Sequence, residues 1–322
     1  MTAFVAKRIA SSLLLLLGLV TVVFVIMRLL PGDPAALFIT PTVPRQVADR
    51  IREQFGLDQP VLVQYLQWLW NALQGRLGFS LVHQKEVGQV IAAAFPHTAA
   101  LAITAVLLEI AGGVSIGTLC ARFRGRFLDR LISSSALVLY TLPTFWVGVL
   151  LLAAFSYGLG LLPPSQTHSI GAETLGIFGY VLDYVVHLIL PAVALAIPGA
   201  AGVARYLRTG LVSALDQEYV TAARSMGVSE RKILTSYALP NAAIPLITVV
   251  GLDIGTLLAG ALVVETLFSW PGMGRLTVLA IFSRDYPLVA GCALLSGTMV
   301  VAANFIADLL YAIFDPRIRI AS

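Results

Sequence analysis

Long apolar segments alternate with short polar ones along most of this 322-residue chain. An apolar run of about 20 residues is long enough to cross a bilayer as a helix. Six such runs lie approximately at residues 9–30, 98–120, 131–157, 184–203, 244–264 and 288–314. The first is too long for a signal peptide and lacks a small-residue cleavage site, so we expect it to remain as a span. The pattern predicts an all-α integral membrane protein with six transmembrane helices.

One polar segment with helix-forming character, residues 216–240, stands between the fourth and fifth runs. Asp216 is a suitable N-cap for a helix that begins at Gln217. Gly227 can adopt the left-handed conformation that ends such a helix, and Val228 is the apolar residue that often follows. Ser229 then caps a second short helix, and Pro240 is expected to end it.

The first of these helices has a face of small and apolar side chains. Residues three, four and seven positions apart align on a helix, which places Tyr219, Ala222, Ala223 and Met226 together. We expect a flat surface that suits a groove on another protein, with basic side chains around it, namely Arg224, Arg231 and Lys232. The other interpretation is an amphipathic hairpin that lies on the membrane or packs within its own chain.

Basic residues indicate the orientation of the chain, because Lys and Arg concentrate in cytoplasmic links. They precede the first run, fill the links between runs two and three and between runs four and five, and follow the sixth. The link between runs three and four has none, and the link between runs five and six has only Arg275 and Arg284. We therefore expect both termini and the 216–240 segment to be cytoplasmic.

Residues 31–96 are too polar to cross a membrane and too long to be a bare loop. Helical periodicity at 43–55 and 60–73 predicts a small helical insertion on the outer side, either a landing surface for an external partner or a lid over the bundle. The expected organisation is a first span with a short cytoplasmic lead at 1–30, this insertion at 31–96, and a five-helix core at 97–322.

Composition agrees with this class. Hydrophobic residues make up 58% of the chain and charged residues 12%, which excludes a soluble globular domain. The net charge of +4 comes from the loop residues, and no basic patch is interleaved with aromatics, so nucleic acid is not an expected partner. Cys120 and Cys292 lie in predicted spans without metal or disulfide spacing, and the four histidines are scattered.

The spacing of Ala222-Ala223, Gly227 and Leu239-Pro240 resembles the cytoplasmic EAA loop of binding-protein-dependent ABC importer permeases. In that family the loop forms a coupling helix in a groove of an ATP-hydrolysing subunit. This sequence departs from the usual pattern at two positions: Thr221 replaces the first Glu, and Tyr237 replaces an Ile. Peptide permeases commonly have T-A-R in place of E-A-A, and residues 221–224 are similar to that variant. The resemblance implies ATPase coupling through Tyr219, Thr221, Ala222, Ala223, Arg224, Met226, Gly227, Val228 and Ser229.

Other stretches are similar to the first-permease, or B-type, subunit of the peptide/nickel family of these importers. They are residues 29–34, 95–98, 140–148, 155–164, 264–276, 284–287 and 304–319. The resemblance implies the type I ABC importer permease fold and import of dipeptides or oligopeptides across a bacterial inner membrane by alternating access. Nickel or another small solute is the alternative substrate.

The same resemblance implies a homologous second permease, two cytoplasmic ATP-binding subunits or one fused ATPase, and an extracytoplasmic peptide-binding protein. Membrane lipid is the remaining partner. ATP and Mg²⁺ would bind the ATPase, no cofactor would bind this chain, and the chain would not be an enzyme. The sequence agrees, because it has no G-x-x-x-x-G-K-[ST] phosphate loop and none of its lysines, Lys7, Lys85 and Lys232, follows a glycine.

Two carboxylates inside the spans, Glu109 and Asp253, are costly in lipid and are candidates for a transport pathway or for interhelical hydrogen bonds. Together with Asp308 they leave open an ion-coupled secondary transporter that works alone. Six spans without a detectable inverted repeat fit that alternative poorly.

A third function class comes from residues 113–117, which match the G-x-S-x-G pattern of a serine nucleophile. With His187, Ser115 would make an intramembrane protease. The motif lies in the middle of a predicted helix, however, where two glycines four residues apart favour close helix packing instead.

Overall fold

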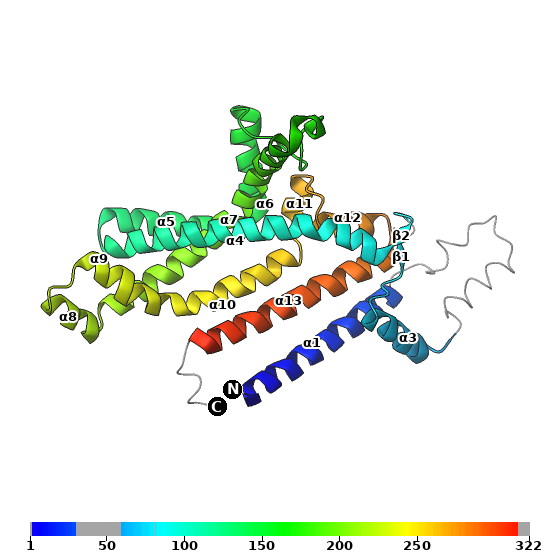
Figure 1. Ribbon diagram of the computed structural model, residues 1–322, viewed down its shortest axis with the longest axis horizontal. Coiled ribbons are helices and arrows are strands. Elements are labelled where there is room, and N and C mark those ends of the chain that lie inside the picture. The colour runs from blue at the N-terminus through cyan, green and yellow to red at the C-terminus, as the bar shows by residue number, and fades with distance from the viewer. Residues whose placement is uncertain (1, 30–58, 81, 315–322) are drawn as a thin grey trace.

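The structure is a computed structural model, and it describes residues 2–29, 59–80 and 82–314. These residues are mostly helical (Figure 1). The first half contains α1 (Thr2–Leu29), α3 (Val61–Leu73), the strands β1 (Phe79–Ser80) and β2 (Lys85–Glu86), α4 (Val87–Arg122), α5 (Phe127–Thr141), α6 (Thr144–Leu151) and the π-helical turn η2 (Leu152–Gly158). The second half contains the 3₁₀ turn η3 (Ala172–Leu175), α7 (Gly176–Leu215), α8 (Glu218–Ser225), α9 (Glu230–Lys232), the π-helical turn η4 (Ile233–Ala238), α10 (Leu239–Leu258), α11 (Leu262–Leu267), α12 (Met273–Phe282) and α13 (Tyr286–Phe314).

Four helical segments are single, long and apolar enough to cross a membrane. They are Ala6–Ile26, Val87–Arg122, Ala172–Leu215 and Tyr286–Leu310. Two bent pairs of helices pass the same criterion together: Phe127–Thr141 with Thr144–Gly158, bent by 105°, and Glu230–Ala243 with Pro245–Leu258, bent by 49°. The described residues therefore provide six spans, as the sequence predicts, if each bent pair is one span.

Two of the predicted spans have different boundaries in the structure. The third, predicted as one run over 131–157, breaks where Leu142 becomes extended before Pro143, because a proline disfavours the helical conformation of the residue before it. The fifth, predicted over 244–264, ends at Leu258. Gly260 follows with φ +111°, and a Cβ there would lie 2.9 Å from the backbone nitrogen of Gly274. The tight turn at this glycine separates α10 from α11.

Helices α4 and α7 pack face to face through small residues. A Cβ on Gly113 would lie 2.5 Å from Cβ of Val203, and a Cβ on Gly117 would lie 2.8 Å from the carbonyl oxygen of Ala204. The glycines four residues apart therefore form the close-packing ridge that the sequence suggests. Ser115 lies between them and is exposed on another side of α4.

This packing rules out the protease interpretation. His187 belongs to α7 but precedes Val203, the residue beside Gly113, by sixteen positions, which is about 24 Å along a helix. Ser115 and His187 are therefore too far apart to act together, and the serine protease hypothesis is wrong.

The terminal helices lie side by side and antiparallel. Arg8 near the start of α1 pairs with Asp308 near the end of α13 at 2.9 Å. At their other ends α3, the helix predicted over 60–73, packs on α1, since Tyr65 shares a 2.8 Å hydrogen bond with Thr21 and a ring contact with Phe24. The second predicted helix of the insertion, 43–55, falls outside the described residues.

Figure 1 shows α8 and α9 at one end of the molecule, and α3 with the β1–β2 hairpin at the other. The hairpin was not predicted from the sequence. It pairs Phe79 with Glu86, and Ser80 donates a 2.5 Å hydrogen bond to Asp285, which precedes α13. The hairpin is thereby attached to the start of the last span.

Candidate functional site

The 216–240 segment folds as a helical hairpin whose turn has a well-defined C-cap. After α8, Gly227 has φ +77° and donates to the Arg224 carbonyl at 3.0 Å, and Val228 donates to the Ala223 carbonyl at 3.1 Å. These two bonds are the Schellman motif, in which a left-handed residue lets the chain leave the helix. The predicted helix end is confirmed. Ser229 occupies the N-cap position of α9, but its side chain makes no capping hydrogen bond there.

The predicted beginning of α8 is wrong by one residue. Gln217, extended at ψ 153°, is the N-cap, and α8 begins at Glu218. Asp216 instead ends α7 with ψ 3°, and that backbone geometry is unlike the extended one of an N-cap. Its carboxylate accepts a 2.7 Å hydrogen bond from Arg124 in the link between α4 and α5. Asp216 therefore ties the hairpin to that link.

Pro240 does not end the helical segment, contrary to the prediction. It lies in the first turn of α10, and the helical winding continues through it. The preceding turn, η4, is a π-helix, and its wider winding leads directly into α10. The hairpin therefore continues into a candidate span without an intervening loop.

Helix α8 has two faces, and the predicted set of four residues is divided between them. Tyr219, Ala222 and Met226 are exposed, the last at 74%. Ala223, predicted to lie on the same surface, is only 1% exposed, and with Val220 it packs against the chain's own hydrophobic core. Ala223 is one position beyond Ala222, a rotation of about 100°, which turns it inward.

The buried face fastens α8 to the two spans beside it. Its core partners come from the end of α7 and from η4 and α10: Leu207, Leu211, Ala214, Leu215, Ile233, Ala238, Ala242 and Leu246. Arg224 adds an ion pair, donating to the two carboxylate oxygens of Glu230 at 2.7 and 3.2 Å, and this bonding raises the pKa of Arg224. The hairpin is therefore one unit with α7 and α10.

The exposed face borders a shallow, open cavity of about 370 Å³. Asp216, Glu218, Thr221, Ala222 and Ser225 line it. We predicted that basic residues surround this surface, but Arg224 is paired with Glu230, and the acidic residues Asp216 and Glu218 line the cavity. The sequence analysis missed this negative charge because it assigned Asp216 to helix capping.

Glu109 and Asp253, identified separately from the sequence, lie together between helices. Glu109 on α4 is 2% exposed, and its carboxyl group lies against Gly199 of α7, where a Cβ would be 2.6 Å from Cδ of Glu109. Asp253 on α10 lies close enough to interact with it electrostatically. Among the described residues, Oε1 of Glu109 has no hydrogen-bond partner. Both residues thus belong to one polar contact of α4, α7 and α10.

Away from α8, two stretches distant in sequence meet around a buried carboxyl group. Glu265 on α11 is 0% exposed and accepts from the Thr98 hydroxyl at 2.9 Å and from the Arg275 backbone N–H at 3.1 Å. Burial raises the pKa of Glu265. Trp270, also buried, donates to the His97 carbonyl at 2.9 Å. Residues 95–98 and 264–276 therefore form one structural unit.

Long apolar helices, two bent helix pairs and a helical hairpin at one end define a helical multi-pass membrane protein. Its family follows from two profiles. The profile described as the binding-protein-dependent transport system inner membrane component matches residues 113–320, and its N-terminal membrane-component counterpart matches residues 1–102. The chain belongs to this family: it is a multi-pass inner-membrane component of a transport system and not an enzyme.

Relatives of known name match over nearly the whole chain. The oligopeptide transport system permease protein AppB of Bacillus subtilis is 38% identical over 320 residues, 99% of this chain and 100% of AppB. The di/tripeptide transport system permease protein DppB of Pseudomonas aeruginosa is 37% identical, with 99% of each chain covered. The glutathione transport system permease protein GsiC of Salmonella paratyphi A is 38% identical, again over 99% of each chain.

Among solved structures, the MetNI methionine ABC transporter in an inward-facing conformation has a similar chain. The TM-score is 0.56 at 16% sequence identity, and the match covers 70% of this chain and 97% of that one. This similarity supports the fold of an ABC importer permease.

Proposed function

We propose that this chain is the permease subunit of an ATP-driven importer of peptides, that it forms half of the translocation pathway, and that it receives the motion of an ATPase through α8. The peptide assignment rests on the relatives, which are named for oligopeptides, for di- and tripeptides and for glutathione, itself a peptide. The coupling assignment rests on one observation: α8 exposes Tyr219, Ala222 and Met226 while its opposite face is fixed to the bundle.

This arrangement suits the transfer of a push. A force on the exposed face reaches α7 and α10 through the shared core around Val220 and Ala223. It also reaches the link between α4 and α5 through the 2.7 Å bond from Arg124 to Asp216. Closure of two ATPase subunits would thus move several spans together and shift the pathway between inward-open and outward-open states.

The proposal requires partners. They are a homologous second permease, two ATP-binding subunits or one fused ATPase on the cytoplasmic side, and a peptide-binding protein on the outer side. ATP and Mg²⁺ would bind the ATPase. The hairpin and both termini would face the cytoplasm, because the links richest in Arg and Lys lie at that end.

A matched pair of substitutions tests the coupling. Ala222→Asp places a charge on the exposed face of α8, and Ser236→Asp makes a similar change at an exposed position of η4 outside that face. In the complete transporter, reconstituted in vesicles, we expect Ala222→Asp to lower ATP-dependent tripeptide uptake at least tenfold and Ser236→Asp to leave it nearly unchanged. The amount of copurifying ATPase reports docking directly.

Three results would contradict the proposal. Normal uptake by Ala222→Asp would remove the coupling role of this face. Uptake that continues without ATP but stops when the proton gradient is abolished would indicate a secondary transporter. Uptake of Ni²⁺ without uptake of any peptide would assign the substrate to the other branch of the family.

A further inference from the structure

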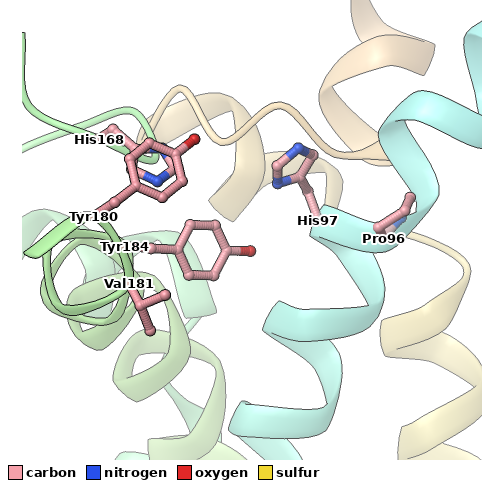
Figure 2. Close-up of a pocket in the computed structure, with 6 residues that line it drawn as sticks. All are labelled: Pro96, His97, His168, Tyr180, Val181 and Tyr184. Carbon is pink, nitrogen blue, oxygen red and sulfur yellow. The ribbon is translucent and has the colours of Figure 1, made fainter. Parts of the chain in front are cut away.

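A second cavity lies at the opposite end of α7 from α8, between α4, the start of α7 and the segment that joins η2 to η3. Its volume is about 290 Å³ (Figure 2). Six residues line it: Pro96, His97, His168, Tyr180, Val181 and Tyr184. In Figure 2 the rings of His97 and of the two tyrosines border the same open space, with His97 on α4 facing Tyr184 on α7.

The walls of this cavity form a continuous series of ring contacts. His168 stacks on Tyr180 with ring centroids 3.9 Å apart and planes inclined by 20°. His168 also lies 5.4 Å from Tyr184, which lies 6.2 Å from His97. Buried Trp270 stands behind Tyr184 at 5.4 Å. Such surfaces favour a flat, apolar or aromatic group, since rings pack well in offset and edge-to-face geometries.

Two ring nitrogens at this cavity lack partners. Nδ1 of His97 and Nε2 of His168 are both inaccessible to solvent, and neither has a hydrogen bond in the described part of the chain. His168 uses its other nitrogen, Nδ1, with the Thr167 hydroxyl at 3.1 Å. Because protein covers both atoms, they offer no hydrogen bond to a group in the cavity, and the accessible surface there consists of the ring faces and edges.

The cavity is also held in shape without a ligand. On one side of His168, the backbone N–H of Gln166 donates to the Phe268 carbonyl at 2.9 Å. On the other side, the Ser169 N–H and hydroxyl donate to the two carboxylate oxygens of Asp183, each at 2.7 Å. His168 is therefore fixed between two anchors, and a preformed site spends little binding energy on ordering.

We propose that this cavity is a subsite for one uncharged aromatic side chain of the transported peptide. This inference rests on the proposed function. The side chain would pack against the rings of His97, Tyr180 and Tyr184 where they border the cavity. The lining residues include no Asp, Glu, Lys or Arg, so the cavity has no countercharge for a peptide terminus or a charged side chain.

The volume supports a single side chain. Pockets for whole small molecules measure about 300–1,000 Å³, and this cavity of about 290 Å³ is at the lower limit of that range. It is too small to enclose an oligopeptide, whose remaining residues would have to lie outside it. The subsite would therefore read one residue and leave peptide length unrestricted.

Photochemical labelling of the complete transporter in lipid nanodiscs tests the proposal. The probe is a tripeptide with a diazirine-bearing phenylalanine between two alanines, and labelled residues are mapped by mass spectrometry. We expect labelling within residues 168–184 that Ala-Tyr-Ala suppresses at least fivefold and Ala-Ala-Ala does not. Val181→Trp, which fills the cavity, should lower the labelling at least fivefold.

Leu182→Trp is the matched control, because Leu182 neighbours Val181, is equally exposed at 53%, and does not line the cavity. It should leave the labelling unchanged. Equal labelling of both variants, or labelling that is confined to other residues, would overturn the subsite. The proposed function would survive that result if the same complex, reconstituted in vesicles, still shows ATP-dependent tripeptide uptake. Loss of binding-protein docking in Val181→Trp with unchanged labelling would also overturn it, since the cavity would then receive the binding protein. Absence of any peptide uptake by the wild-type complex would overturn the proposed function itself.

Discussion

Arg208 on α7 and Asp129 on α5 form a two-bonded ion pair, with the guanidinium Nε and Nη2 donating to the two carboxylate oxygens at 2.6 and 2.7 Å. Asp129 is buried, and it also accepts from the Gly125 N–H at 2.9 Å. Asp129→Ala would remove the buried partner of Arg208, whose own side chain is 32% exposed, and would also remove the acceptor of the Gly125 N–H. We expect a loss of about 2 kcal/mol of stability, since hydrogen bonds to charged groups contribute about 1.5–3 kcal/mol, measured as a lower unfolding temperature in detergent.

The pair of Arg124 with Asp216 provides the comparison. The distance from Nη1 of Arg124 to Oδ1 of Asp216 is similar, 2.7 Å, but both side chains are about half exposed. Exposed ion pairs contribute about 0–1 kcal/mol, so Arg124→Ala should lower the unfolding temperature far less than Asp129→Ala. Equal effects would show that burial does not distinguish the two pairs.

A second prediction concerns the contact between α4 and α7. Gly113→Ala would place a methyl group 2.5 Å from Cβ of Val203, so the helices must move apart. Overpacking of this kind costs about 1–3 kcal/mol. Gly88, in the same helix, has no atom within 4 Å of a built Cβ, and alanine there should stabilise by up to about 1 kcal/mol. Thermal unfolding of the two variants should therefore shift in opposite directions; shifts of the same sign would contradict the packing argument.

The spans could be predicted from the sequence because bilayer thickness imposes a length on every apolar run. The positions at which the helices bend or end could not be predicted from the same runs. The bend of 105° after Thr141 and the end of α10 at Leu258 depend on what surrounds Pro143 and Gly260. A hydropathy pattern reports only that the residues are apolar, and so the bend and the helix end both fell inside simple apolar runs.

The candidate site shows the same limit. Helical spacing places Ala222 and Ala223 near each other, but which of them faces outward depends on Leu211 and Ile233, which come from other elements. The contact of Glu265 with Thr98 joins residues 167 positions apart, and no local pattern predicts it. Local capping, by contrast, was predictable at Gly227, because a positive φ there is required by the chain's own turn.

The third prediction concerns Gly227. Proline cannot adopt its φ of +77°, and it would lack the N–H that donates to Arg224. We expect Gly227→Pro to abolish transport while the chain still inserts in the membrane, as judged by its amount in washed membranes. Gly227→Asn, which tolerates the left-handed region, should retain most of the uptake. Normal uptake by the proline variant would show that the turn geometry is dispensable.

The fourth prediction separates the two faces of α8. Ala223→Asp would bury a charge beside Val220 and Ile233, whereas Ala222→Asp places it in solvent. An unpaired buried charge is far costlier than an exposed one, so only the first variant should loosen the hairpin. Limited trypsin digestion at Arg224 and Arg231 should then be at least tenfold faster in Ala223→Asp. Equal digestion rates would place both residues on one exposed face.

The last prediction is a pH dependence that originates at Glu265. Burial raises its pKa in the folded protein above the value of about 4.3 for an exposed glutamate. Between these two pKa values the folded state binds more protons than the unfolded state, so this group makes stability fall as pH rises through the folded pKa. Wild-type unfolding temperature should therefore include a component that increases on acidification towards pH 4.3, and Glu265→Gln should lack it. The glutamine variant should also be less stable throughout, because its amide cannot accept from both the Thr98 hydroxyl and the Arg275 N–H. An identical pH profile in the two proteins would show that Glu265 has the same affinity for a proton in the folded and the unfolded chain.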